Sequence, residues 1–238
     1  MHSDHLKSKV AIVTGASKGI GRAIALSLAK AGMSVALAAR ARKGLEAVAK
    51  EIERAGGTCM TIPTDVSVES QVAHLIAETT TKFGRVDVLV NNAGYGVFAN
   101  IIDADVKDFD GMMQVNLRGV FLCSKAVLPY MFKQHAGDII NISSLAGKNS
   151  FVGGAMYSAS KWGLIGFARS LMLEVREHNV RVVTICPGSV NTSFSDHSAD
   201  AARIIQPEDV AETVLFALSM PGRSNVSEID IRPTLKPK

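Results

Sequence analysis

Short apolar runs alternate with longer segments of helical periodicity along the chain. Several of the short runs lack the polar–apolar alternation of a strand that is exposed on one face. They predict seven strands, at residues 9–15, 34–40, 58–65, 86–94, 138–144, 180–188 and 228–233. The longer segments predict helices at residues 20–31, 43–55, 67–83 (capped by Ser67), 106–134, 156–177 and 207–219.

This alternation of strands and helices predicts an α/β fold with a mainly parallel sheet and right-handed crossovers. A doubly wound sheet of this kind carries helices on both faces and binds ligands at the carboxyl ends of its strands. No linker, repeat or low-complexity segment interrupts the pattern. We therefore expect a polar tail at residues 1–8 and a single domain at residues 9–238.

The composition narrows the class of protein. Of the 238 residues, 47% are hydrophobic and 20% are charged, which is typical of a soluble globular protein. The net charge of +4 comes without a run of Lys or Arg, which suits small anionic ligands at least as well as nucleic acid. No secretion-signal pattern or long apolar run occurs. We expect a cytoplasmic protein that binds neither nucleic acid nor membrane.

The three cysteines, Cys59, Cys123 and Cys186, are far apart and odd in number. This pattern argues against a disulfide framework and fits a reducing compartment. Neither a CxxC nor an HExxH motif occurs, so we expect no metal site.

A glycine-rich turn follows the first predicted strand and leads into the first predicted helix. It reads TGASKGIG and places glycines at Gly15, Gly19 and Gly21. Glycine permits the tight turn and lets a pyrophosphate approach the backbone N–H groups at the start of the helix. The GxxxGxG spacing differs from the more common GxGxxG, so a purely structural turn is the alternative.

The second strand ends on a cation, where NAD-binding folds usually place an acid for the ribose 2′-hydroxyl. Arg40 stands there, and Lys18 lies in the glycine-rich turn. Two cations near the adenosine ribose would pair with a 2′-phosphate. This arrangement predicts NADP(H) as the cofactor; the alternative is an arginine that only faces solvent.

Polar residues also follow the third and fourth strands. The NNAG segment at 91–94 ends in small residues that would let the backbone lie against a flat ligand. Its asparagines would contact that ligand or bond the local backbone, and both roles can hold together. Asp65, which precedes Val66, would accept a hydrogen bond from an adenine amino group or cap the next helix. The sequence leaves this choice open.

Four further polar residues stand at conspicuous places. Asn116 is a poor interior residue for the helix in which it lies, and it would hold a water or distort the backbone there. Ser144 ends the fifth strand, Tyr157 follows thirteen residues later, and Lys161 lies one helical turn beyond. A Tyr and a Lys at i and i+4 share one face of a helix; taken alone, such a pair is usually two solvated neighbours.

Together, these motifs resemble the short-chain dehydrogenase/reductase family. TGxxxGxG, NNAG, the Asn within a helix, the Ser, YxxxK and the PGxVxT motif at 187–192 occur in the family's order and spacing, and the resemblance spans residues 9–234. It implies a Rossmann-like, doubly wound sheet of seven strands in the order 3-2-1-4-5-6-7. It also implies that one domain both binds the dinucleotide and carries out the catalysis.

The resemblance assigns roles to Asn116, Ser144, Tyr157 and Lys161. Tyr157 would give a proton to the carbonyl oxygen in reduction, and Ser144 would bond that oxygen. Asn116 would position a water that links Lys161 to solvent. Lys161 would bond the nicotinamide ribose and lower the phenol pKa from its ordinary value of about 10. With Tyr157 and Lys161, the residues implied to bind NADP(H) are Gly15, Ser17, Lys18, Gly19, Ile20, Gly21, Arg40, Asp65, Val66, Asn92, Ala93, Gly94, Pro187, Gly188, Val190 and Thr192.

The substrate is less well defined than the chemistry. We expect a general NADPH-dependent carbonyl reductase with a short lid at residues 191–206. A 3-oxoacyl-[acyl-carrier-protein] reductase is the alternative, although the C-terminal strand lacks the Gly-Gly ending common in those enzymes. A non-catalytic dinucleotide-binding regulator is a third reading, which the complete Asn-Ser-Tyr-Lys set disfavours. The expected pocket mixes apolar surface with hydroxyl groups: Tyr95, Val97, Ser150, Phe151, Val152, Ser189 and Phe194.

The two long helical patterns are apolar around most of their circumference. A helix on a monomer normally buries one stripe, so residues 106–134 and 156–177 predict a second partner. Pairing across a two-fold axis would bury both helices, and the family resemblance also implies a dimer or tetramer. The alternative is that the extra apolar residues meet loops of the same chain.

Overall fold

The computed structural model describes residues 4–194 and 203–235. All seven predicted strands form, and they make one sheet in the expected order β3-β2-β1-β4-β5-β6-β7. Every pair of neighbouring strands is parallel. The strands are β1 Val10–Thr14, β2 Ser34–Ala39, β3 Thr58–Pro63, β4 Val88–Asn91, β5 Gly137–Ile142, β6 Val180–Pro187 and β7 Glu228–Ile231.

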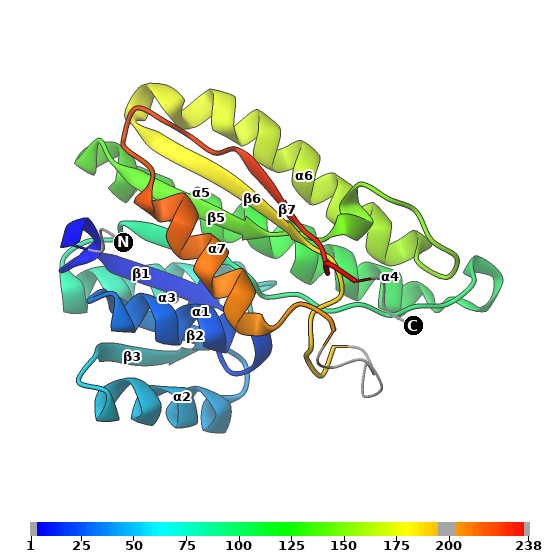
Figure 1. The fold of residues 1–238 in the computed structure, drawn as a ribbon, viewed down its shortest axis with the longest axis horizontal. Coiled ribbons are helices and arrows are strands. Elements are labelled where there is room, and N and C mark those ends of the chain that lie inside the picture. Colours follow the sequence, from blue (N-terminus) through cyan, green and yellow to red (C-terminus); the bar gives the residue numbers. More distant parts are fainter. Residues whose placement is uncertain (1–3, 195–202, 236–238) are drawn as a thin grey trace.

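Helices cover both faces of this sheet (Figure 1). One face shares a hydrophobic cluster with α1, α2 and α7, and the other face shares a second cluster with α3, α5 and α6. The α-helices of the described residues are α1 Gly19–Lys30, α2 Arg42–Arg54, α3 Glu69–Phe83, α4 Val106–Met113, α5 Gly119–Gln134, α6 Ala155–Val175 and α7 Pro207–Ser219.

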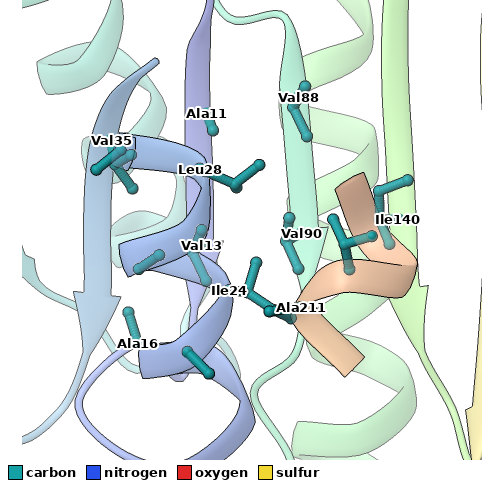
Figure 2. Close-up of a cluster of buried hydrophobic side chains, with 14 of the residues drawn as sticks. Ala11, Val13, Ala16, Ile24, Leu28, Val35, Val88, Val90, Ile140 and Ala211 are labelled. Carbon is teal, nitrogen blue, oxygen red and sulfur yellow. The ribbon is translucent and has the colours of Figure 1, made fainter. Parts of the chain in front are cut away.

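Successive residues of the central strands are buried on opposite faces of the sheet. In β1, Ala11 and Val13 belong to the cluster under α1 and α7, whereas Ile12 belongs to the cluster under α5 and α6. Figure 2 shows the first of these clusters, in which Ile24 of α1 lies near Ala211 of α7 above the sheet. Because both faces are covered, the strands are apolar without alternation.

The order of the sheet reverses at β1. This strand lies between β2 and β4, so the chain builds β2 and β3 on one side of it and the remaining strands on the other. The crossover helices diverge there and leave a crevice at the carboxyl ends of β1 and β4. The glycine-rich turn after β1 and the NNAG segment after β4 both enter this crevice.

Most helices lie within one or two residues of their expected bounds, but one has a different N-cap and another is divided. The helix expected from residue 67 begins at Glu69 with Val68 as its N-cap, so Ser67 is not the cap. The reason is Asp65, whose Oδ1 accepts hydrogen bonds from the N–H of Ser67 at 2.9 Å and from its hydroxyl at 2.6 Å. These bonds hold Ser67 in the turn that precedes the helix.

The helix expected at residues 106–134 is divided. A π-helical turn, Gln114–Arg118, joins α4 to α5. A π turn inserts one residue into the helical repeat, and such turns are frequent at functional sites. Hydrophobic periodicity over the whole segment does not show a single inserted residue, so the pattern predicted one continuous helix.

The N-terminal segment also contributes to the core. Within the part expected to be a polar tail, Asp4–Leu6 forms a 3-10 helix and Leu6 is buried. The ring of His5 forms a hydrogen bond of 3.0 Å with the carbonyl oxygen of Leu218 at the end of α7. These contacts attach the segment to the face of the sheet that α1 and α7 cover.

The three cysteines lie in separate elements, with Cys59 on β3, Cys123 on α5 and Cys186 on β6. All three are free and buried. Within residues 4–194 and 203–235, no helix is both long enough and apolar enough to cross a membrane.

Candidate active site

A cleft of about 1280 Å³ opens at the carboxyl ends of the strands. The glycine-rich turn and the segments after β4, β5 and β6 all contribute to its lining. Of the residues expected to bind the cofactor, all except Gly21 line the cleft: Gly15, Ser17, Lys18, Gly19, Ile20, Arg40, Asp65, Val66, Asn92, Ala93, Gly94, Tyr157, Lys161, Pro187, Gly188, Val190 and Thr192.

The glycine-rich turn has a conformation that requires glycine. Gly15 and Gly19 have φ angles of +66° and +55°, which side chains rarely tolerate. A Cβ on Gly21 would lie 2.3 Å from the carbonyl oxygen of Gly15 and 2.4 Å from Nδ2 of Asn92. Gly21 therefore permits close packing of α1 on the sheet and does not face the cleft. The turn delivers the N-terminus of a 12-residue helix to the cleft, which suits a dinucleotide pyrophosphate.

The turn after β1 is fastened to the end of β4 by a residue that the motif analysis did not single out. The hydroxyl of Thr14 donates to the carbonyl oxygen of Val90 at 3.1 Å. It also accepts from the N–H groups of Asn92 and Ala93, both at 3.0 Å. Nδ2 of Asn92 donates to the carbonyl oxygen of Thr14 at 2.9 Å. Asn92 therefore bonds the local backbone, as one of its two expected roles requires, and joins the ends of β1 and β4.

The end of the cleft that we expected to bind the adenosine carries Arg40 and Lys18. Arg40 is exposed at the end of β2, and no acidic residue stands in its place. Lys18 is also exposed, and its Nζ donates to the hydroxyl of Ser193 at 3.1 Å. Burial raises the pKa of Asp65, but hydrogen bonds from Ser67 and the charge of Arg40 outweigh this effect, and the net pKa is lowered. Asp65 is therefore an anion whose Oδ1 accepts hydrogen bonds from Ser67.

Asn116 lies in the π-helical turn and is buried. Its Oδ1 accepts from the N–H of Tyr95 at 3.1 Å, and its Nδ2 donates to the carbonyl oxygen of the same residue at 2.9 Å. Nδ2 also donates to the hydroxyl of Ser160 at 3.0 Å. Asn116 does not line the cleft. It joins the segment after β4 to α6 and thereby holds two walls of the cleft together.

Tyr157 and Ser144 lie together at the inner wall of the cleft. Ser144 follows β5, and its Oγ accepts from the N–H of Ala146 at 3.1 Å. Burial raises the pKa of Tyr157 to about 12, and a hydrogen bond with Ser144 counteracts only part of that rise. The expected lowering of this pKa is not found, because the loss of hydration outweighs the nearby groups.

Lys161 is buried one turn beyond Tyr157 on α6. Its Nζ donates to the carbonyl oxygen of Ile142 at 3.0 Å. Burial lowers the pKa of Lys161 to about 8. A Cβ on Gly94 would lie 3.1 Å from Oδ1 of Asn116 and 3.7 Å from Nζ of Lys161, so glycine at this position leaves the ammonium accessible from the cleft.

The outer end of the cleft differs in part from the expected substrate pocket. Tyr95, Ser150, Phe151, Ser189 and Phe194 line it as expected. Val97 and Val152 do not: the first packs near Met112, and the second is 92% exposed. Several lining residues were not expected from the sequence, among them Phe98, Leu145, Asn149, Arg232 and Leu235. The available signal for Phe98 was its position four residues after the NNAG segment.

Part of the expected lid, residues 195–202 of 191–206, lies outside the described residues. On either side of it, Val190 and Ile205 form a parallel bridge, and the N–H of Asn191 donates to the carbonyl oxygen of Ile205 at 2.8 Å. In the described part of the chain, no group of three or more His, Cys, Asp or Glu side chains could hold a metal ion.

Comparison with known proteins identifies close relatives. The profile of the family described as short chain dehydrogenase matches residues 9–202. An uncharacterized oxidoreductase of Staphylococcus saprophyticus is 39% identical over 230 residues, which cover 96% of this chain and 98% of that protein. A 3-oxoacyl-[acyl-carrier-protein] reductase of Synechocystis is 39% identical over 231 residues, which cover 93% and 94% respectively.

Among solved structures, a metagenomic short-chain oxidoreductase in complex with NADP is 41% identical to this chain. The two folds superpose with a TM-score of 0.87, over 97% of this chain and 99% of that one.

Proposed function

Because the chain belongs to the short-chain dehydrogenase family, we propose that it is an NADPH-dependent oxidoreductase that interconverts a carbonyl group and an alcohol. One observation carries the proposal. Tyr157 and Lys161 are both buried, yet both line the cleft, and Ser144 is hydrogen-bonded to the phenol. A phenol and an ammonium that served only the structure would have no reason to face a cavity of dinucleotide size.

The choice of NADPH rests on the adenosine end of the cleft. Arg40 and Lys18 line that end, and β2 does not end on an acid that would repel a 2′-phosphate. Arginine binds phosphate through two parallel hydrogen bonds, which gives it more specificity than a simple charge. The metagenomic relative whose structure was solved with NADP supports the same choice.

A nicotinamide held by Tyr157, Lys161 and residues 187–192 would supply a hydride when bound, and in the proposed mechanism the protein's own residues supply the proton. The pKa of Tyr157 is about 12, so the phenol is protonated at neutral pH and is ready to act as an acid. As charge develops on the carbonyl oxygen, Oη of Tyr157 donates its proton there and Oγ of Ser144 donates a hydrogen bond. In oxidation, the same phenol oxygen takes the proton back.

Lys161 and Asn116 would support this proton transfer without donating the proton to the substrate. The ammonium of Lys161 lies 5.8 Å from the centre of the Tyr157 ring, and its charge would stabilise the phenolate that forms after donation. Asn116 positions Tyr95 and Ser160 and so holds the NNAG segment against α6. We also propose that Asn116 positions a water that links Lys161 to solvent.

For the substrate, we propose a small carbonyl compound or its alcohol. In the described residues, the lining of the substrate end mixes aromatic rings with Ser144, Asn149 and Ser150 and includes no acidic side chain. A 3-oxoacyl-[acyl-carrier-protein] reductase is the second candidate, favoured by the Synechocystis relative of that name. The absence of a Gly-Gly pair after β7 separates this chain from the pattern common in those reductases.

We also propose that the enzyme is a dimer or tetramer that pairs through α5 and α6. Phe121, Trp162 and Leu173 on these helices are 44%, 53% and 59% exposed. A shallow apolar groove between the helices is lined by Leu117, Phe121 and Phe167, among others. A face this apolar is typical of an isologous interface.

The deciding experiment measures NADPH oxidation with a panel of ketones, aldehydes and a short β-ketoacyl thioester, with NADH in parallel. We expect turnover of ketones or aldehydes with NADPH. Selective turnover of the thioester would favour the acyl-carrier reductase. Binding of NADPH without turnover of any member would contradict the proposal of an enzyme.

A further inference from the structure

Three phenylalanines from three separate loops meet at the substrate end of the cleft. Phe98 follows β4, Phe151 follows β5 and Phe194 follows β6. The ring centre of Phe98 lies 5.7 Å from that of Phe151 and 6.1 Å from that of Phe194. We call these three residues the phenylalanine cluster.

The ring of Tyr157 is part of the same arrangement. Its centre lies 5.5 Å from that of Phe98, with a near-perpendicular interplanar angle of 78°, and 5.6 Å from that of Phe194. These distances fall within the range in which aromatic rings attract one another through edge-to-face or tilted contacts. The cluster is therefore in direct contact with the residue that would donate the proton.

The backbone around the cluster leaves room for the rings. A Cβ on Gly96 would lie 2.8 Å from Cζ of Phe194 and 2.9 Å from Cζ of Phe98. A Cβ on Gly154 would lie 2.4 Å from Cζ of Phe151. The N–H of Ala99 donates to the carbonyl oxygen of Gly153 at 3.0 Å and ties two of the loops together. The rings are thus held in place by the fold.

The cluster remains accessible to a ligand. Phe98, Phe151 and Phe194 are 44%, 47% and 41% exposed, although rings of this size gain most from full burial. In the described part of the three loops, no charged side chain lines the cleft. Apart from Arg232, which follows β7, the substrate end therefore offers ring faces and edges with a few neutral hydrogen-bonding groups.

We infer that the phenylalanine cluster selects substrates in which the reacting carbon carries an aromatic ring, such as aryl ketones, aryl aldehydes or the corresponding benzylic alcohols. This inference rests on the proposed function. A substrate ring that packs against Phe98 and Phe194 lies beside the ring of Tyr157. Its attached carbonyl group can then reach the hydroxyls of Tyr157 and Ser144, so one contact gives both affinity and orientation.

The test compares acetophenone with cyclohexyl methyl ketone, which has the same carbon skeleton with a saturated, non-planar ring. The kcat/KM of each is measured with NADPH, and the ratio of the two values is compared among variants, so that the different intrinsic reactivities cancel. We expect Phe98→Leu and Phe194→Leu to lower the aryl-to-cyclohexyl ratio about threefold to tenfold relative to the unaltered enzyme. Gly96→Ala, which pushes on both rings, should lower it as well.

The matched control is Phe216→Leu, since Phe216 is 53% exposed on α7 and does not line the cleft. It should leave the ratio unchanged. Melting temperatures of all variants check that folding is intact. Turnover of both ketones with an unchanged ratio in the cluster variants would overturn the inference and leave the proposed function standing. No turnover of any carbonyl compound would overturn both.

Discussion

The ammonium nitrogen of Lys161 lies 5.8 Å from the centre of the Tyr157 ring. In unfolded chains the two groups titrate close together, near pH 10. In the fold, burial raises the pKa of Tyr157 to about 12 and lowers the pKa of Lys161 to about 8. At neutral pH the phenol of Tyr157 therefore keeps its proton, and the amine of Lys161 still carries its charge.

Replacing Tyr157 with Phe should abolish carbonyl reduction and leave NADPH affinity nearly unchanged. The substitution removes the proton that the substrate oxygen requires but keeps the ring that packs against Phe98. Loss of a general acid lowers kcat by about 10²- to 10⁴-fold. Steady-state kinetics and NADPH fluorescence titration measure the two effects. Tyr130→Phe on α5 is the control and should retain activity; near-normal turnover by Tyr157→Phe would refute the assignment.

The shifted pKa of Lys161 should appear in the stability of the protein. Its folded pKa of about 8 lies below the unfolded value of 10.5, so the unfolded chain binds more protons and the free energy of unfolding rises with pH across this window. Lys161→Met lacks this contribution. The stability of the wild type relative to Lys161→Met should therefore increase by about 1 kcal/mol between pH 7 and pH 9.

Urea unfolding of both proteins at pH 7, 8 and 9 measures this difference. Cys123, Cys186 and Tyr157 also have raised pKa values, and they oppose the trend by losing stability at high pH. They are present in both proteins, so their effects cancel in the comparison. A difference that does not change with pH would mean that Lys161 titrates at its ordinary pKa.

Arg40→Asp should shift the cofactor preference toward NADH. The change removes a charge-assisted contact to the 2′-phosphate and adds repulsion, and each effect costs on the order of 1–3 kcal/mol. The ratio of kcat/KM for NADPH and NADH, measured with one ketone, reports the shift. Arg42→Asp is the control, because Arg42 begins α2 and does not line the cleft. A wild type that prefers NADH would contradict the interpretation of Arg40 and Lys18.

Light scattering at micromolar concentration should give a mass of two or four chains, each of 25.3 kDa. Phe121→Asp introduces a charge into the exposed apolar face of α5 and α6 and should shift the mass toward a single chain. Ile102→Asp, at a residue that is 90% exposed outside these helices, should not. A wild-type mass near 25 kDa would contradict the predicted assembly, and the exposed apolar side chains of α5 and α6 would then not serve self-association.

Most of the fold follows from local patterns that the sequence contains. Strands buried on both faces, such as β1 with Ile12 on one side and Val13 on the other, must be apolar throughout, and such a run can be recognised in the sequence. The π turn at Asn116 cannot be recognised in the sequence, because one inserted residue leaves the average hydrophobic periodicity almost unchanged. The predicted start of α3 was wrong for a different reason: Ser67 donates its hydrogen bonds to Asp65 in the turn before the helix and does not cap the helix.

The candidate site was predictable where a motif concentrates its residues, and less so where separate loops meet. The sequence identified Tyr157 and Lys161 but not the direction in which the Tyr157 pKa moves, since burial is a property of the assembled fold. Phe98 was missed because its partners, Phe151 and Phe194, are more than fifty residues away along the chain. Thr14 was overlooked because its hydroxyl acts on a strand that neighbours β1 only in space.

The rates at which the three buried cysteines are alkylated should measure local unfolding of the elements that contain them. Burial raises the pKa values of Cys186 and Cys123 to about 11 and about 12, so neither is a reactive thiolate while its element is closed. Alkylation of each cysteine must therefore await an excursion that exposes it. Cys59 on the edge strand β3 should react first, and the rate at Cys186 on β6 should fall if NADPH binds as proposed. One thiol reagent can thus measure local unfolding at β3, α5 and β6 through native cysteines, without an engineered label.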